Sequence, residues 1–263
     1  MTSWIVTTNS TVARTLAGSE LGIIGVNGTI STTSGAPISL SGVNGQTTSL
    51  VVAGQVLTTV GVAISGPAGR LNISIAETGI VSGDFGYSGL VVNHLTLDNA
   101  GEMIGTQTAA NTILGTATTT AMITNSGRMI GGDLGLGVNT VNITTAAVVD
   151  NSGTIQGGET DISKNSIFEA GTEGLIKIVN SGTISGGTLA LDLRAGNDTV
   201  LNSGVIKGRS DLGDGNDSFD NRFGTVSGTV LGGAGNDRFR PGAGEEIFDG
   251  EAGTDLLDLR GAK

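Results

Sequence analysis

A short pattern that recurs every 20 to 29 residues limits most strongly how this chain can fold. In most copies an Asn is followed by one or two small residues and a Gly, and an apolar side chain lies two residues after the Gly. Repeats of this length are typical of proteins built as a stack of similar units, each of which contacts only its neighbours. The clear copies are VNGTI at 26–30, DNAGEMIG at 98–105, TNSGRMIGG at 124–132, DNSGTIQGG at 150–158, VNSGTISGG at 179–187, LNSGVIKG at 201–208 and DNRFGTVSG at 220–228.

The irregular spacing of the copies favours strands over helices. A helical repeat keeps a fixed length, whereas the coils of a β-solenoid can differ in loop length while their strands stay aligned. Short runs such as Ala147–Val149 and Ile176–Ile178 also alternate with a period of two, which is the period of a strand. The recurring glycines are Gly28, Gly54, Gly79, Gly101, Gly127, Gly153, Gly182, Gly204, Gly224 and Gly244.

Two apolar columns emerge when the copies are aligned on these glycines. One lies two residues after the Gly and is broken only in the last copy, by Glu246; the other lies two residues before the Asn. Stacked apolar columns form a continuous interior. The first column is Ile30, Val56, Val81, Met103, Met129, Ile155, Ile184, Ile206 and Val226, and the second is Leu97, Ile123, Val149, Ile178, Val200 and Phe219.

We therefore predict an all-β fold, a right-handed parallel β-helix or β-solenoid of about ten coils. At about 4.8 Å per coil such a rod would be about 50 Å long. The asparagines form a further column, which we expect at corners in the left-handed conformation, with side-chain amides hydrogen-bonded from coil to coil. They are Asn99, Asn125, Asn151, Asn180, Asn202 and Asn221.

Composition narrows the possible functions. The 263 residues include 46 Gly but only 3 Pro, which does not fit collagen, and 37% are hydrophobic, which argues against a disordered chain. The absence of Cys excludes disulfides and thiolate metal sites. A net charge of −11 makes nucleic acid an unfavourable partner. No apolar run is long enough to predict a transmembrane segment.

Four Gly-rich turns near the C-terminus each end on an Asp. These residues, Asp198, Asp217, Asp237 and Asp255, are separated by 19, 20 and 18 residues, which is about one coil each. The spacing predicts a column of carboxylates beside Gly carbonyls, and hard oxygen ligands of this kind suit Ca²⁺ better than a transition metal. The turns lie in RAGNDTV (194–200), LGDGNDSF (212–219), LGGAGNDRF (231–239) and DGEAGTDLL (249–257).

These turns resemble the calcium-binding nonapeptide of the repeats-in-toxin (RTX) family, G-G-x-G-x-D-x-U-x, where U is a large apolar residue. The third turn matches every fixed position, and the other three match in part. The resemblance implies Ca²⁺ bound between consecutive turns, at Asp198/Asp217, Asp217/Asp237 and Asp237/Asp255, with the middle two turns the best formed. The glycines that would supply the turns and carbonyls are Gly196, Gly213, Gly215, Gly232, Gly233, Gly235, Gly250 and Gly253.

The chain departs from the family in one respect. An RTX β-roll carries such turns on both edges, whereas here the opposite edge keeps the Asn–Gly corner and has no repeating Asp. We expect Arg194, at a Gly position of the first turn, to weaken that site. The predicted organisation is one continuous solenoid with an N-terminal cap at 1–24, calcium-free coils at 25–190 and RTX-like calcium-binding coils at 191–263.

Weak calcium sites stabilise a fold only where the ion is abundant, so we expect a secreted, extracellular protein of bacterial type. RTX-like proteins leave the cell through a type I exporter that reads an uncleaved C-terminal signal. The start of this sequence lacks a signal-peptide pattern, and GTDLLDLRGAK at 253–263 resembles the stretch that often follows RTX repeats.

The predicted function is that of a secreted structural or adhesive solenoid, with a cell surface or a polysaccharide as an open candidate partner. A β-helix polysaccharide lyase or epimerase is one alternative, and a calcium-dependent folding module of a larger exported enzyme is another. No catalytic motif is present, so the sequence favours a protein without enzymatic activity. Residues that a polysaccharide-processing groove could use are Asp84, His94, Asp133, Lys164 and Lys177.

Overall fold

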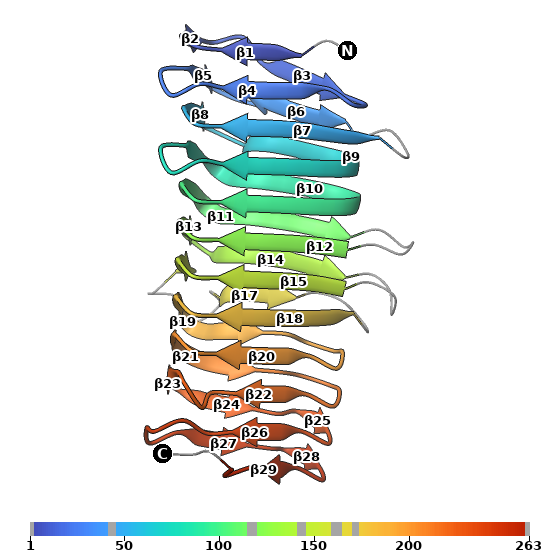
Figure 1. The fold of residues 1–263 in the computed structure, drawn as a ribbon, viewed down its shortest axis with the longest axis vertical. Helices are drawn as coiled ribbons and strands as arrows, with labels where there is room; N and C mark the ends of the chain where they lie inside the picture. The colour runs from blue at the N-terminus through green and yellow to red at the C-terminus, as the bar shows by residue number, and fades with distance from the viewer. Residues whose placement is uncertain are drawn as a thin grey trace.

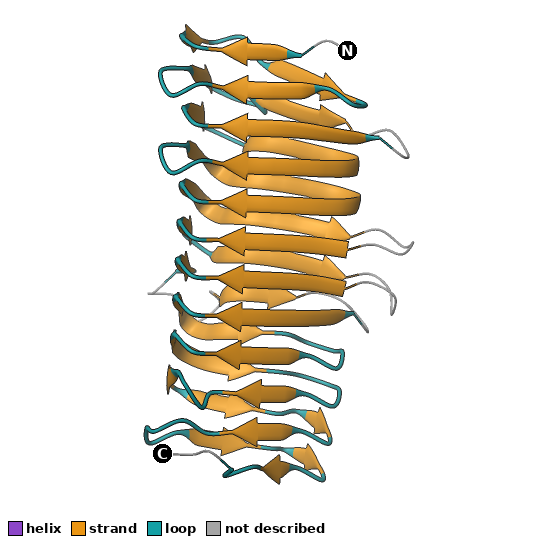
Figure 2. Ribbon diagram, in the orientation of Figure 1, coloured by secondary structure: helices purple, strands orange, loops and turns teal. Residues whose placement is uncertain are grey.

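The computed structural model describes residues 3–41, 46–114, 120–140, 146–158, 165–169 and 174–260. Within these ranges the chain forms strands joined by turns and contains no helix (Figure 2). Over the same ranges, therefore, no helical segment could cross a membrane. Lys164, one of the residues considered for a catalytic groove, lies outside the described residues.

Three ladders of parallel strands build the described part of the molecule. The first runs through β1 (Trp4–Val6), β4 (Leu21–Ile24), β7 (Thr47–Val52), the ends of β9 (Val62–Ile75) and β10 (Ile80–Asn99), β12 (Thr120–Asn125), β15 (Ala146–Asn151), β18 (Leu175–Asn180), β20 (Thr199–Asn202), β22 (Ser218–Asp220), β26 (Arg238–Arg240) and β29 (Leu256–Leu257). Its strands run across the near face of Figure 1.

The second ladder follows the Asn–Gly corner and the third completes each coil. The second runs through β2 (Asn9–Ser10), β5 (Thr29–Thr32), β8 (Gln55–Thr58), the starts of β10 and β11 (Glu102–Leu114), β13 (Arg128–Gly131), β16 (Thr154–Gln156), the starts of β19 (Thr183–Asp192) and β21 (Val205–Asp211), and β23 (Thr225–Ser227). The third runs through β3 (Arg14–Ala17), β6 (Ile38–Ser41), the first part of β9, the middle of β10, the end of β11, β14 (Leu134–Thr140), β17 (Asn165–Glu169), the ends of β19 and β21, β24 (Thr229–Leu231) and β27 (Ile247–Asp249).

This arrangement confirms the predicted fold class, an all-β parallel solenoid. In Figure 1 the first-ladder strands run leftward in front and the third-ladder strands run rightward behind, while the chain descends from N to C. The coil is therefore right-handed, the hand that parallel crossovers adopt almost without exception. The prediction of about ten coils was counted at the Asn–Gly corner, and ten described strands of the second ladder follow this corner.

Residues assigned from the sequence to an N-terminal cap already take part in the ladders. β1 pairs in parallel with β4, and β3 pairs in parallel with β6. The indole of Trp4 packs against the end of the apolar core, close to Leu16, which is fully buried. The first coil thus carries its own cover, in the form of one large aromatic side chain.

Both predicted apolar columns are confirmed by strand register. Each member of the first column lies beside its counterpart in the next coil, and Ile30 to Ile206 are fully buried, whereas Val226 is partly buried. The second column is continuous from Leu97 to Phe219. Because the side chains stack on equivalents of similar size, one core passes through every coil.

The asparagine column is a chain of side-chain hydrogen bonds. Each Nδ2 donates to the Oδ1 of the Asn one coil later, at 2.6–2.7 Å from Asn99 through to Asn221. The same Nδ2 also donates to a backbone carbonyl in the next coil, as Asn125 does to Thr154 O at 3.0 Å. All six side chains are buried, and these amides satisfy one another away from water, except for the Oδ1 atom of Asn99, which has no hydrogen bond to a described residue.

Two details of this column differ from the sequence-based prediction. The asparagines are not left-handed, because among the described non-Gly residues only Arg194 and Glu251 have a positive φ. Five of them end strands of the first ladder, and Asn221 directly follows β22. Glu246, which interrupts an apolar column, ends the amide chain instead: its carboxylate accepts from Asn221 Nδ2 and from the backbone N–H of Gly242. Because every amide points the same way, a negative group at the donor end is electrostatically favoured.

We predict that Asn151→Ala destabilises the protein by about 2–4 kcal/mol, because it leaves a buried donor on Asn125 and a buried acceptor on Asn180 unsatisfied. Asn72→Ala removes an exposed amide from β9 and should change stability by less than about 0.5 kcal/mol. Chemical denaturation followed by circular dichroism measures both values. Equal effects of the two substitutions would contradict a structural role for the column.

Candidate metal-binding turns

The four Asp-bearing turns lie one above another at the edge opposite the Asn–Gly corner. Each connects a third-ladder strand to the next first-ladder strand, as β21 is connected to β22 and β24 to β26. Within the last two turns, β25 (Ala234–Gly235) and β28 (Ala252–Gly253) form a small parallel sheet of their own (Figure 1). The four turns thus stack in register along one edge, as the carboxylate spacing predicted.

The backbone repeats its conformation from turn to turn. The second position of the motif has φ of 67° at Arg194, 93° at Gly213, 101° at Gly233 and 60° at Glu251. The fourth position, which is Gly in all four turns, has φ between 145° and 147°. Arg194 and Glu251 therefore accept a left-handed conformation that costs a non-Gly residue on the order of 1 kcal/mol or more. The stacked neighbours impose the turn geometry even where the sequence departs from the motif.

Close packing explains the Gly at the fourth position. A Cβ built on Gly215 would lie 1.5 Å from the carbonyl oxygen of Gly196, and one on Gly235 would lie 1.7 Å from that of Gly215. Successive turns therefore rest with their carbonyls directly against the next Gly. No residue with a side chain fits there without separating the coils.

The Asp side chains form a ladder that runs toward the N-terminus. Asp198 Oδ1 accepts from the backbone N–H of Ile176 at 2.8 Å, and Asp217 Oδ1 accepts from that of Asp198 at 2.7 Å. The same bond joins Asp237 Oδ1 to Asp217 N–H at 2.8 Å and Asp255 Oδ1 to Asp237 N–H at 3.0 Å. Each carboxylate thus uses one oxygen to hold the preceding coil.

The second oxygen of the first three carboxylates has no such partner. The Oδ2 atoms of Asp198, Asp217 and Asp237 are buried without a hydrogen bond to any described residue, and the three residues are 1–2% exposed. A buried charged oxygen without a partner costs several kcal/mol unless a proton or a cation satisfies it. A column of such atoms is the strongest physical indication of a cation in this structure.

Burial shifts the acidity of these groups upward. Desolvation raises the pKa of Asp198 to about 7, partly offset by its hydrogen bond from Ile176. Desolvation also raises the pKa of Asp217 to about 8, and repulsion by the neighbouring carboxylates of Asp198 and Asp237 adds to this rise. The pKa of Asp237 is raised as well, chiefly by burial. Near neutral pH the ion-free column therefore holds protons that a divalent cation would displace.

The first position of the motif separates the turns into two kinds. At Gly232 and Gly250 the Asp carboxylate occupies the place that a side chain would take: a Cβ there would lie 2.3 Å from Asp237 Oδ2 and 2.1 Å from Asp255 Oδ2. The Gly250 carbonyl also approaches the Gly232 position, at 2.9 Å. Leu193 and Leu212 take this position in the first two turns and belong to the buried core. This close approach of a carboxylate to Gly distinguishes the pair Asp237/Asp255 from the first two turns, whereas the sequence alone favoured the middle two turns.

Side chains alone do not form a metal cage here. Among the described residues, no three His, Cys, Asp or Glu side chains gather closely enough to hold an ion. A site in these turns would therefore combine one or two carboxylates with the stacked Gly carbonyls. That donor set is all oxygen, and the flexible coordination of Ca²⁺ tolerates it better than that of Mg²⁺.

The structure gives separate surroundings to the residues considered for a catalytic groove. Asp84 accepts from Gly61 N–H at 2.8 Å and from Thr106 Oγ1 at 2.7 Å, and the Thr106 bond in particular lowers its pKa. His94 Nδ1 lies 2.7 Å from Thr120 Oγ1, and Lys177 lies beside Thr199 in the first ladder. Asp133 bonds through its N–H to Gln107. None of these contacts joins two of the candidates.

Sequence reasoning missed two polar features near the turns. Asn197 Oδ1 accepts from Asn216 N–H at 2.7 Å, and Asn216 Oδ1 accepts from Asn236 N–H at 2.8 Å, so the residue before each Asp forms a second ladder in the opposite direction. The recurring Gly-Asn-Asp triplet in the sequence could have predicted this ladder. Arg194, expected to weaken the first site, pairs with Asp192 at 2.9 Å.

We predict that Gly215→Ala destabilises the C-terminal coils by at least about 3 kcal/mol, because its methyl group would meet the Gly196 carbonyl. Gly244→Ala is the matched control. A Cβ at Gly244 would meet no atom closer than 3.9 Å, and its effect should stay within about 0.5 kcal/mol. Hydrogen exchange of the C-terminal amides would register the difference, and equal protection in both variants would show that the coils do not stack this closely.

The raised pKa values of Asp198 and Asp217 give the pH dependence a definite sign. In the folded state these groups keep protons up to about pH 7 and 8, whereas in the unfolded chain they release them near pH 4. The folded state binds more protons in this window, so in a chelator the stability of the C-terminal coils should fall as pH rises from 4 to 8. Thermal midpoints across this range test the sign, and a rising midpoint would contradict it.

Comparison of the chain with protein-family models, with curated protein sequences and with solved structures gave no significant match.

Proposed function

We propose that this protein is a secreted structural or adhesive β-solenoid whose C-terminal coils are fastened by Ca²⁺. The observation that carries the proposal is the column of buried carboxylate oxygens without partners at Asp198, Asp217 and Asp237. Their one-coil spacing and the adjacent Gly turns agree with the RTX-like motif that the sequence displays. The solenoid supplies the scaffold, and the ion compensates the charge that stacking has concentrated at one edge.

The proposed ion acts on stability. Stacked carboxylates repel one another, and their burial adds a desolvation cost, so the edge that carries them is the weakest part of the rod. A divalent cation between consecutive turns would offset both the repulsion between the carboxylates and the cost of burying them. It would also bind the Gly carbonyls. Sites of this kind in extracellular modules bind with Kd on the order of 10⁻⁴–10⁻³ M, so the coils would tighten outside the cell, where calcium is abundant.

The adhesive role is favoured over catalysis by what the described surface offers. Asp84, His94 and Lys177 each lie against other residues, and the strands of each ladder repeat from coil to coil. A rigid rod with repeating faces suits the presentation of a binding surface, as solenoids commonly do.

A calcium titration tests this function. Calcium should raise the thermal midpoint of the chain, and chelation should lower it by several degrees, since about 1 kcal/mol corresponds to 2–4 °C in a chain of this size. Asp217→Asn combined with Asp237→Asn should abolish the calcium response. It should also raise the stability of the ion-free protein near neutral pH, because a buried Asn carries no charge and needs no proton uptake on folding.

Asp98→Asn is the control, since Asp98 is an exposed acid in β10 far from the turns in sequence. The thermal midpoint of the Asp98→Asn variant should equal that of the parent protein, both with and without calcium. An unchanged midpoint of the parent protein on chelation, or a calcium response that survives in the double variant, would refute the calcium role.

A further inference from the structure

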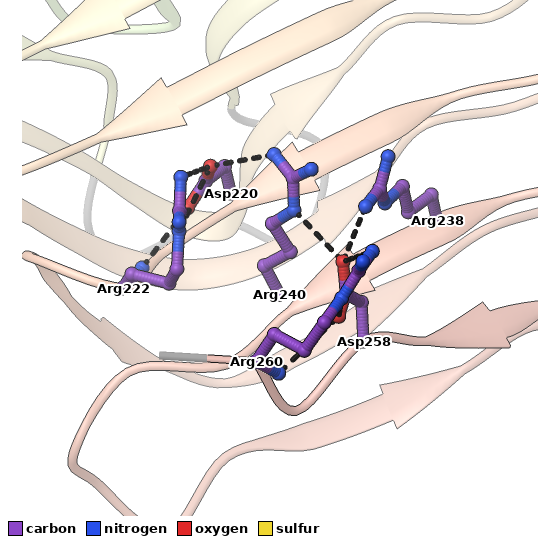
Figure 3. A network of polar contacts seen from close by, with 6 residues as sticks. All are labelled: Asp220, Arg222, Arg238, Arg240, Asp258 and Arg260. Atoms are coloured by element: carbon purple, nitrogen blue, oxygen red, sulfur yellow. Dashed lines mark hydrogen bonds and ion pairs between the residues drawn. The ribbon is translucent and has the colours of Figure 1, made fainter. Parts of the chain in front are cut away.

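A second charged surface lies on the outer side of the C-terminal coils, away from the Asp turns. Four arginines gather there around two aspartates (Figure 3). We call this group the arginine patch: Arg222, Arg238, Arg240, Arg260, Asp220 and Asp258. Its net charge of two positive units stands out on a chain whose net charge is −11, so the patch creates a local positive potential on an acidic rod.

Strand register places the patch on three successive coils. Asp220 in β22 lies beside Arg240 in β26, and the N–H of Asp258 donates to the Phe239 carbonyl in the preceding coil. Arg240 bridges the two aspartates, through Nη1 to Asp220 at 3.1 Å and through Nε to Asp258 at 3.2 Å. The charges are therefore spaced by the rise of the coil, roughly 4.8 Å.

The arginines outnumber the carboxylates that hold them. Arg222 uses Nε and Nη2 on Asp220, and Arg260 uses Nε and Nη2 on Asp258. These side-chain hydrogen bonds do not use the Nη1 atom of Arg222 or of Arg260. The two aspartates thus fix the guanidinium groups in place, and donors remain for an external anion. Preorganised donors of this kind lose little entropy on binding.

An apolar hollow adjoins the patch at the Asn–Gly corner. It has a volume of about 240 Å³ and is lined by Leu201, Ser203, Arg222 and Phe223, among others. Phe223 is 72% exposed, and the Arg222 guanidinium lies 5.7 Å from the centre of its ring. Together these groups offer a ring to stack on, a hydroxyl and a cation within one site.

We propose that the arginine patch and Phe223 bind an anionic glycan, a linear sugar polymer that carries carboxylate or sulfate groups. The flat face of a sugar ring would lie on Phe223, and acidic groups along the polymer would meet the guanidinium groups of successive coils. The proposal names the partner of the adhesive role above and rests on that part of the proposed function. It uses neither the Asp turns nor calcium.

Isothermal titration of the full chain with defined oligosaccharides tests the proposal, at a fixed calcium concentration too low to gel the sugars. The probes are a hexamer of galacturonate, a heparin-derived hexasaccharide and maltohexaose as the neutral control. At least one anionic probe should bind, and its affinity should fall as the salt concentration is raised. Maltohexaose should not bind. The anionic probe that binds more tightly shows which acidic group of the glycan, carboxylate or sulfate, the site prefers.

Phe223→Ala and Arg260→Gln each change an exposed side chain and should each weaken binding about tenfold. Arg128→Gln removes the same charge from an exposed Arg of β13, where Arg128 pairs with Glu102, and should leave affinity unchanged. Thermal midpoints with calcium, measured on every variant, show separately whether the calcium role holds. Three results would overturn the proposal: equal binding of maltohexaose, unchanged affinity in both patch variants, or equally tight binding of a single-stranded DNA of the same charge.

Discussion

The hydrogen bonds between consecutive coils are the constraint on which the rest of this structure depends. They are parallel and in register, so every residue lies beside its equivalent one coil earlier and one coil later. An apolar residue placed this way extends the core, and an Asn extends a chain of amides. The same geometry forces an Asp to lie over another Asp, which is unfavourable for an ionised side chain. In-register stacking of equivalent residues therefore produces both the stability of the rod and the electrostatic cost at one edge.

Much of this architecture is readable from the sequence, because stacking turns spatial contacts into a spacing along the chain. The glycine-aligned columns that predicted Ile155 beside Ile184, and Val149 beside Ile178, correspond to strand register in the structure. The amide contacts of the Asn column could be predicted for the same reason. The Asp turns were placed correctly along one edge, since their spacing equals the coil length.

Other features could not be read from spacing alone. The asparagines are extended because their amides reach along the rod axis from strand ends, so a corner conformation was the wrong expectation. Glu246 looked like a defect in an apolar column, and only the coordinates show that its carboxylate meets Asn221. Leu193 and Leu212 stand at Gly positions of the motif but serve the core. The arginine patch joins residues from separate coils that do not recur at the coil spacing, so the sequence periodicity could not predict it.

Because each coil contacts only the coils before and after it, cooperativity in this rod is of the nearest-neighbour kind. Loosening one interface need not unfold distant ones, and a rod of this type frays from its ends. The core-column residue of the last described coil, Leu257, is 51% exposed, whereas Phe239 beside it in the preceding coil is 2% exposed. The Asp turns and the arginine patch both lie in these C-terminal coils of the described rod. An ion bound there would set how many coils are folded at a given moment, and so how far the rod reaches.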